Sequence, residues 1–288
     1  QGVGVAEAAT QHALAYALDR KQGRAPGAGK DDNDAVSIIQ HPDVRRMLLT
    51  MRALTDASRA ICYENGVMAD IAESTGDEAA RAKNDLLTPI SKAFSTDIAN
   101  EVAAIGVQVH GGMGFVEETG AAQHVRDARI LTIYEGTNGI QAMDLVGRKL
   151  PLGNGSVVAV YISKMRETAE TCRQSNSPVL VDIAERLCAA IDVLQDTTDW
   201  VLAQKGSLDV LAGATPYLRL FGLVAGCHYL ARGAHGVTTG DVEPNFAKRK
   251  TASAQFYAHN LLSAVGGLSD AVKAGNAMLE DIGLEKRD

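Results

Sequence analysis

The chain has 288 residues, of which 46% are hydrophobic and 22% are charged, and its formal net charge is −7. An acidic balance without a clustered basic excess excludes a dedicated nucleic-acid-binding protein. No apolar run reaches the roughly 18 residues that a membrane-spanning helix needs. The four cysteines are scattered without a Cys-x-x-Cys pair, which predicts reduced, buried thiols in a soluble cytoplasmic protein.

Apolar residues in the first half of the chain recur with the period of an α-helix. The clearest stripe starts at residue 44, and His41-Pro42-Asp43 before it places a proline and an acidic residue at a helix start. Residues 23–34, rich in glycine, lysine and aspartate, are predicted to form an exposed loop. The predicted helices of this half cover residues 6–18, 44–61, 89–109 and 137–150.

Residues 151–155, Pro-Leu-Gly-Asn-Gly, predict a boundary between a domain over residues 1–150 and another over residues 151–288. Residues 157–162 are rich in β-branched side chains, but no partner strand is evident, so a helix is predicted there. The remaining prediction for the second half is a loop over residues 232–244 and helices over residues 156–172, 179–205, 214–231, 246–264 and 268–280. The predicted fold class is all-α, with two helical bundles in series.

Several reaction classes are excluded because their residue spacings are missing. No histidine follows a glutamate by three residues, as a ferritin-like di-iron bundle requires. The chain also lacks the G-x-x-x-x-G-K-[ST] phosphate loop and the G-x-S-x-G elbow of hydrolases. No metal is expected, because the cysteines and histidines do not show the spacing of metal ligands.

Two segments stand out, over residues 108–118 (QVHGGMGFVEE) and 134–141 (YEGTNGIQ). In the second, Gly136 lets the backbone turn and approach a ligand closely, and Thr137 and Asn138 start the next helix with its free amides. Glu135 beside these donors is a candidate for a buried base next to an anion or carbonyl site. On the residues alone, a solvated acid at a helix start is the alternative.

These two segments, Gln-x-x-Gly-Gly-x-Gly-Phe and Tyr-Glu-Gly-Thr-Asn, resemble the C-terminal half of the acyl-CoA dehydrogenases, a family of flavoenzymes. The resemblance covers residues 2–150 at least. After residue 150 the chain resembles the extra helical domain of longer bacterial members, among them the methylmercaptopropionyl-CoA dehydrogenases. The resemblance implies a bundle of the acyl-CoA dehydrogenase C-terminal type followed by an accessory helical domain.

The resemblance also implies roles for individual residues. Glu135 matches the base that removes the α-proton of an acyl-CoA thioester while a hydride passes from the β-carbon to FAD, giving a trans-2-enoyl-CoA in fatty-acid β-oxidation. Gly136 matches a residue that touches the acyl-CoA substrate. The residues that match FAD contacts are Arg20, His41, Gln108, Gly111, Gly112, Thr137 and Asn138.

Partners follow from the same resemblance. It implies an electron-transfer flavoprotein as electron acceptor, and a homodimer or tetramer, because Arg20 and Gln108 match residues that face the FAD of a neighbouring subunit. The chain starts within a helical pattern, without the domains that cover FAD and substrate in this family. We therefore expect it to be part of a polypeptide about twice as long and to be inactive alone.

Two alternatives remain open at this point. The isolated chain can be a non-catalytic helical module for oligomerisation, since it lacks half of the family's active site. The intact protein can be an acyl-CoA oxidase, which differs from a dehydrogenase in whether the reduced flavin meets oxygen. The sequence does not separate these possibilities.

Overall fold

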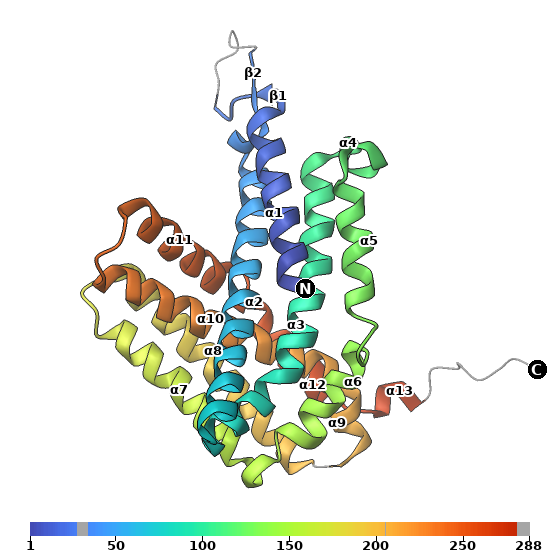
Figure 1. The fold of residues 1–288 in the computed structure, drawn as a ribbon, viewed down its shortest axis with the longest axis vertical. Helices are drawn as coiled ribbons and strands as arrows, with labels where there is room; N and C mark the ends of the chain where they lie inside the picture. Colours follow the sequence, from blue (N-terminus) through green and yellow to red (C-terminus); the bar gives the residue numbers. More distant parts are fainter. Residues whose placement is uncertain (28–33, 205, 281–288) are drawn as a thin grey trace, which may run out of the picture. The chain divides into compact units, whose positions relative to one another are not determined.

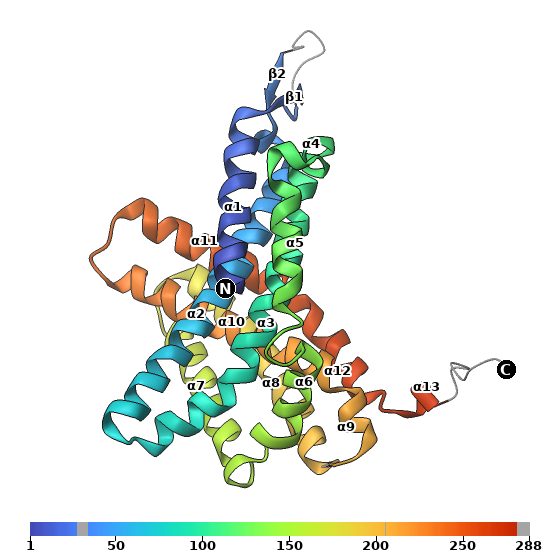
Figure 2. The same ribbon diagram turned by 45° about the vertical axis from the view of Figure 1, so that its right-hand side comes forward.

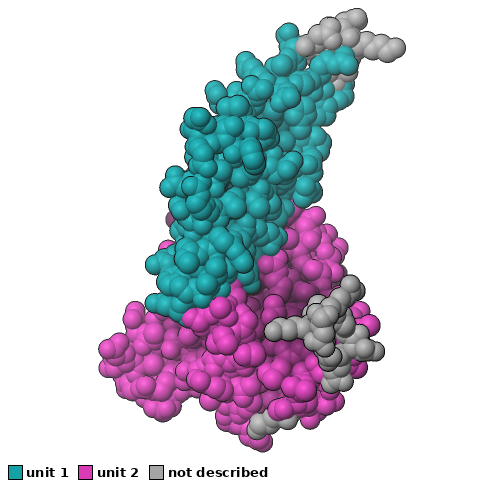
Figure 3. All heavy atoms as spheres, turned by 90° about the vertical axis from the view of Figure 1, so that its right-hand side faces the viewer, with its two compact units in different colours: residues 1–59, 95–135 teal, residues 60–94, 136–288 magenta. Residues whose placement is uncertain are grey.

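The computed structural model describes residues 1–27, 34–204 and 206–280, and over these residues the chain is all-α apart from one short β-ribbon (Figure 1). No helix within these residues is long and apolar enough to cross a membrane. Contacts divide the chain into two compact units, residues 1–59 with 95–135 (unit 1) and residues 60–94 with 136–288 (unit 2), coloured separately in Figure 3. Two long helices, α2 (Pro42–Thr75) and α3 (Glu78–His110), each contribute one part to each unit.

Unit 1 combines its parts of α2 and α3 with further short elements. These are α1 (Gly2–Asp19), β1 (Lys21–Arg24), β2 (Ala35–Ser37), a 3₁₀ turn η1 (Ile38–Gln40), α4 (Gly112–Phe115), a 3₁₀ turn η2 (Glu117–Thr119) and α5 (Ala121–Leu131). Strand β1 pairs with β2 in antiparallel fashion.

Helix α1 buries a row of alanines, Ala6, Ala9, Ala13 and Ala17, and packs against α5. Small side chains at helical spacing let neighbouring helices approach closely.

Unit 2 is built around one central helix. Its elements after the α3 part are α6 (Asn138–Asp144), a π-turn η3 (Leu145–Lys149), a 3₁₀ turn η4 (Leu152–Gly155), α7 (Ser156–Arg173), α8 (Pro178–Ala203), α9 (Leu208–Ala212), α10 (Ala214–Thr239), α11 (Pro244–Asn260), a 3₁₀ turn η5 (Leu262–Ala264), α12 (Val265–Lys273) and α13 (Ala277–Glu280). Every residue from 220 to 231 in α10 is buried, because α6, α7, α8, α11 and α12 all contact this helix. A helix that is apolar all round is stable only when it is enclosed in this way.

The structure confirms several predicted elements. Residues 157–162 are helical, within α7, so the helix prediction was right and the strand alternative was wrong. Helix α2 begins at Pro42, where the proline and Asp43 predicted a helix start. The turn at residues 151–155 lies within unit 2, and the division of the chain into domains at residue 150 stays a prediction.

Other predicted boundaries were wrong. The loop expected over residues 232–244 is helical as far as Thr239, because burial of Ala231 and Ala234 outweighs the cost of about 1 kcal/mol for each helical glycine. Helix α3 begins at Glu78 and continues through Pro89. A proline inside a helix costs about 3 kcal/mol, and here burial of the neighbouring Leu86, Leu87 and Ile90 compensates.

The expected loop over residues 23–34 is also different. Its first residues belong to β1, and residues 28–33 lie outside the described residues. The last predicted helix, over residues 268–280, is divided between α12 and α13. The helix expected over residues 137–150 is α6 followed by the π-turn η3.

Candidate active site

The glycine-rich segment over residues 108–116 forms the end of α3 and the short helix α4. Gly111 ends α3 with φ 61°, a left-handed conformation that glycine adopts without strain. Gly114 is required for a different reason, because a Cβ there would lie 2.4 Å from the backbone oxygen of Val107. Gln108, Gly111 and Gly112 are exposed, so their polar groups and bare backbone are accessible from outside the unit.

His110 at the end of α3 packs inside unit 1. Its Nδ1 lies 2.7 Å from the backbone oxygen of Gly106, and its ring stacks on Tyr16 at 4.4 Å between centroids. Burial, together with the nearby His12 and His124, lowers the pKa of His110. The ring is therefore neutral and serves packing. Among the described residues, no group of histidine, cysteine and acidic side chains is arranged to hold a metal ion.

Arg20 and His41 lie at the ribbon end of unit 1. Arg20 ends α1, and its side chain is exposed while its backbone oxygen accepts from Ile38 at 2.8 Å. The His41 ring is 2.8 Å from the backbone oxygen of Gln22, which connects the start of α2 to β1. Figure 2 shows β1 and α4 at the same end of α1, so the structure brings Arg20 and His41 to the end of the unit that carries Gln108, Gly111 and Gly112.

Glu135 lies at the other end of unit 1. The hydroxyl group of the preceding Tyr134 donates a hydrogen bond to the side-chain oxygen of Gln1, just before α1. The 18 residues of α1 separate this end from Arg20, and at 1.5 Å per residue that is about 27 Å. The expected FAD contacts of unit 1 are therefore on one end, and the expected base is on the other.

The backbone of Glu135 has an uncommon conformation. Its φ is 53°, and within the described residues Asn154 is the other non-glycine residue with positive φ. Such a conformation costs about 1–3 kcal/mol and persists only where the surroundings determine it. The side chain is exposed, which differs from the buried base expected, and the neighbouring Ile133 and Tyr134 are exposed as well.

The turn that follows Glu135 in the chain is held by a residue that the sequence motifs do not identify. The Lys92 ammonium on α3 donates to the backbone oxygen of Gly136 and to Oδ1 of Asn138, each at 2.8 Å. Asn138 in turn donates to the backbone oxygen of Ala93 at 3.2 Å. Gly136 has φ 81°, and a Cβ there would lie 3.2 Å from Nε2 of Gln141. No local signal in the sequence links Lys92 to a turn more than forty residues away.

Thr137 caps helix α6, as predicted for a residue at a helix start. Its hydroxyl oxygen accepts from the backbone N–H of Ile140 at 3.4 Å. This arrangement uses one of the free amides that were expected to face a ligand. The turn at residues 136–138 is therefore fixed from two sides, by the threonine cap and by Lys92.

Replacing Lys92 with methionine should loosen this turn. The variant keeps an unbranched side chain one atom shorter and removes both hydrogen bonds, which together stabilise the turn by more than about 1 kcal/mol. Amide hydrogen exchange over residues 136–141, measured by mass spectrometry, should become about tenfold faster. Arg81→Met on the same helix removes a surface pair with Glu78 and is the matched control. Unchanged exchange in the Lys92 variant would show that the turn is held by other contacts.

Both the sequence and the structure of this chain are similar to those of known proteins. The family model described as "Acyl-CoA dehydrogenase, C-terminal domain" matches residues 1–150, and "Acetyl-CoA dehydrogenase C-terminal like" matches residues 161–282. The 3-methylmercaptopropionyl-CoA dehydrogenase of Ruegeria pomeroyi is 46% identical over 272 residues, which are 91% of this chain and 45% of that protein. The chain thus spans about half the length of this relative.

Two solved structures share the fold. Caenorhabditis elegans ACDH-11, in complex with C11-CoA, has a TM-score of 0.76 at 16% identity, covering 98% of this chain and 46% of that one. An acyl-CoA dehydrogenase from Bacillus anthracis, complexed with FAD, has a TM-score of 0.72 at 19% identity, covering 94% and 46%. At these identities the structures show that the fold is shared.

Proposed function

This chain belongs to the acyl-CoA dehydrogenase family, and we propose that it forms the C-terminal part of an FAD-dependent enzyme that converts an acyl-CoA thioester to a trans-2-enoyl-CoA. The observation that carries the proposal is the conformation of Glu135, held at positive φ directly before a turn that Lys92 and Thr137 fix. Strained backbone of this kind gathers at active sites.

In the proposed reaction, the Glu135 carboxylate takes the proton from the α-carbon of the thioester. The backbone N–H of Glu135 polarises the thioester carbonyl, which stabilises the negative charge that develops on that oxygen. Gly136 contacts the acyl chain without a side chain in the way. A bound FAD would supply the acceptor for the hydride that leaves the β-carbon, and loss of the proton and the hydride would leave a double bond between the two carbons.

The residues of this chain fit an FAD contact surface. The exposed Arg20 guanidinium is a suitable donor for pyrophosphate oxygens. Gly111 and Gly112 present bare backbone, with open space among the described residues where a Cβ would stand. Together with Gln108 and His41 these residues would hold the cofactor of a neighbouring subunit, and Thr137 and Asn138 would face the cofactor next to Glu135. We propose a homodimer or tetramer for this reason.

An anaerobic titration of the intact polypeptide tests the proposal. Purified intact protein should contain stoichiometric FAD, and acyl-CoA should bleach the visible absorbance of the flavin without oxygen. Electron-transfer flavoprotein should then restore the absorbance. Hydrogen peroxide formed in step with substrate in air would identify an oxidase instead. Intact protein that binds no flavin would overturn the proposal and favour a non-catalytic helical module.

A further inference from the structure

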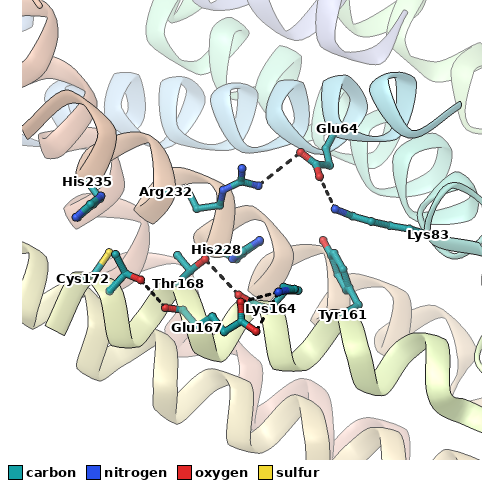
Figure 4. A pocket seen from close by; sticks show the side chains of 11 residues that line it. Glu64, Lys83, Tyr161, Lys164, Glu167, Thr168, Cys172, His228, Arg232 and His235 are labelled. Atoms are coloured by element: carbon teal, nitrogen blue, oxygen red, sulfur yellow. Dashed lines mark hydrogen bonds and ion pairs between the residues drawn. The ribbon is translucent and has the colours of Figure 1, made fainter. Parts of the chain in front are cut away.

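Unit 2 contains a polar cavity that none of the roles above uses. It has a volume of about 480 Å³ and lies between α7, α10 and the parts of α2 and α3 in this unit (Figure 4). Its walls carry three cations, Lys83, Lys164 and Arg232, and two carboxylates, Glu64 and Glu167. We call it the polar cavity.

The charges in the polar cavity do not balance. Glu64 on α2 pairs with both Lys83 and Arg232, the latter at 3.5 Å, and is mostly buried. Lys164 pairs with Glu167 one turn further along α7, at 2.8 Å. The lining of the polar cavity thus carries three positive and two negative charges, and one further anion would make it neutral.

His228 adds an unsatisfied polar group to the same wall. It is 3% exposed, and its Nδ1 is buried with no hydrogen-bond partner among the described residues. Burial, with Arg232 and Lys83 nearby, lowers the pKa of His228 to about 3, so the imidazole is neutral at physiological pH. A neutral imidazole can donate one hydrogen bond, and an unsatisfied buried nitrogen is stabilised by any ligand that bonds to it.

An apolar pocket adjoins the polar cavity. It has a volume of about 430 Å³, and its apolar side chains include Met68, Ile71, Leu86 and Val160. Among the described residues its one carboxylate, Asp77, accepts from the backbone N–H groups of Ala79 and Ala80 at the start of α3. Val160 is 61% exposed, although it is a large aliphatic residue on a helix whose opposite face is buried. The pocket shares Lys83, Tyr161 and Lys164 with the polar cavity, so the same side chains line both spaces.

We propose that the polar cavity and the apolar pocket together bind a fatty-acid anion. The carboxylate would lie among Lys83, Lys164 and Arg232, and the aliphatic chain would lie on Val160, Met68 and Leu86. The three cations against two carboxylates in the polar cavity favour an anionic head there, and the adjoining apolar surface favours an aliphatic chain. Each volume is within the range of small-molecule sites. This proposal concerns residues distinct from Glu135 and does not depend on the function proposed above.

Calorimetric titration of this chain with sodium dodecanoate, below the concentration at which micelles form, tests the proposal. Dodecanoate should bind saturably with one site per chain. Dodecanol, which lacks the charge, and butyrate, which lacks the long chain, should each bind at least tenfold more weakly. Equal binding of dodecanol and dodecanoate would overturn the proposal, as would the absence of saturable dodecanoate binding.

Variants at exposed positions show whether binding occurs at this site. Val160→Asp puts a carboxylate against the aliphatic chain, and Lys164→Glu reverses a charge in the polar cavity. Each should weaken dodecanoate binding at least tenfold. Leu208→Asp and Arg166→Glu are the matched controls, since both side chains are exposed in unit 2 and lie outside the two spaces. Binding that is unchanged in Val160→Asp and Lys164→Glu would overturn the proposal.

A direct measurement does not depend on the variants. A dodecanoate that carries a photoreactive diazirine on its chain should crosslink to residues 68–86 and 156–164, identified by mass spectrometry. Crosslinks confined to other parts of the chain would contradict the proposed site.

Discussion

Replacing Glu135 by glutamine in the intact polypeptide should leave acyl-CoA binding in place and slow flavin reduction at least about a thousandfold. Glutamine has the size of glutamate but does not accept the α-proton as a carboxylate does. Glutamate and glutamine have about the same conformational strain at φ 53°, so the backbone of the turn should not change. Anaerobic stopped-flow absorbance of the flavin measures the rate, and the spectral shift on adding acyl-CoA measures binding.

A control separates this effect from a general change of surface charge. Glu118→Gln removes another exposed carboxylate in unit 1, and the flavin of this variant should be reduced at the normal rate. Glu135→Asp keeps the carboxylate but moves it back by one methylene, so it should keep part of the activity. Normal bleaching by the Glu135→Gln protein would show that another group takes the proton, and the role proposed for Glu135 would be wrong.

Substituting alanine for Gly222 should lower the free energy of unfolding of the chain by about 3 kcal/mol. A Cβ at this position of α10 would lie 2.3 Å from the ring of Phe94, which is 1% exposed on α3. A contact this short with a buried ring requires the ring or the backbone of α10 to shift. For a chain of this size the melting temperature should fall by about 6–12 °C, measured by calorimetry.

The same helix supplies the control. Gly233→Ala meets no atom within 4 Å among the described residues, so it should raise the stability by up to about 1 kcal/mol through helix propensity. Phe94→Leu frees space beside Gly222, so the double variant with Gly222→Ala should be about 1 kcal/mol more stable than the two single effects predict together. Equal stabilities of Gly222→Ala and the parent chain would contradict the close approach of α10 to α3.

Local sequence patterns were sufficient to predict the fold class and most of the helices. The stripe from residue 44 and the Pro42-Asp43 start identified α2, because a helix start depends on residues next to each other in the chain. The same reasoning failed at Pro89 and at Gly233, where local residues oppose a helix. In both places burial against other elements stabilises the helix, and that contribution cannot be predicted from a short stretch of sequence.

In the candidate site, too, some features could be predicted from local sequence and others could not. The residues from Tyr134 to Asn138 were recognisable as a motif, and the structure shows that Thr137 caps α6 as a residue before a helix should. Lys92 was not recognisable, because a surface lysine inside a long helix has no distinctive neighbours. The strained backbone of Glu135 and the exposure of its side chain also needed the three-dimensional structure.

The amino-acid sequence by itself determined the helical class of this protein, its family and the order of its motifs, because these depend on residue types at short spacing. Only the tertiary structure decided which residues share an end of unit 1, which lysine holds the turn after Glu135, and which charges face one another in the polar cavity. Those arrangements join residues that are tens of positions apart. Packing and burial supply the free energy that stabilises these arrangements, and both arise only when the chain folds.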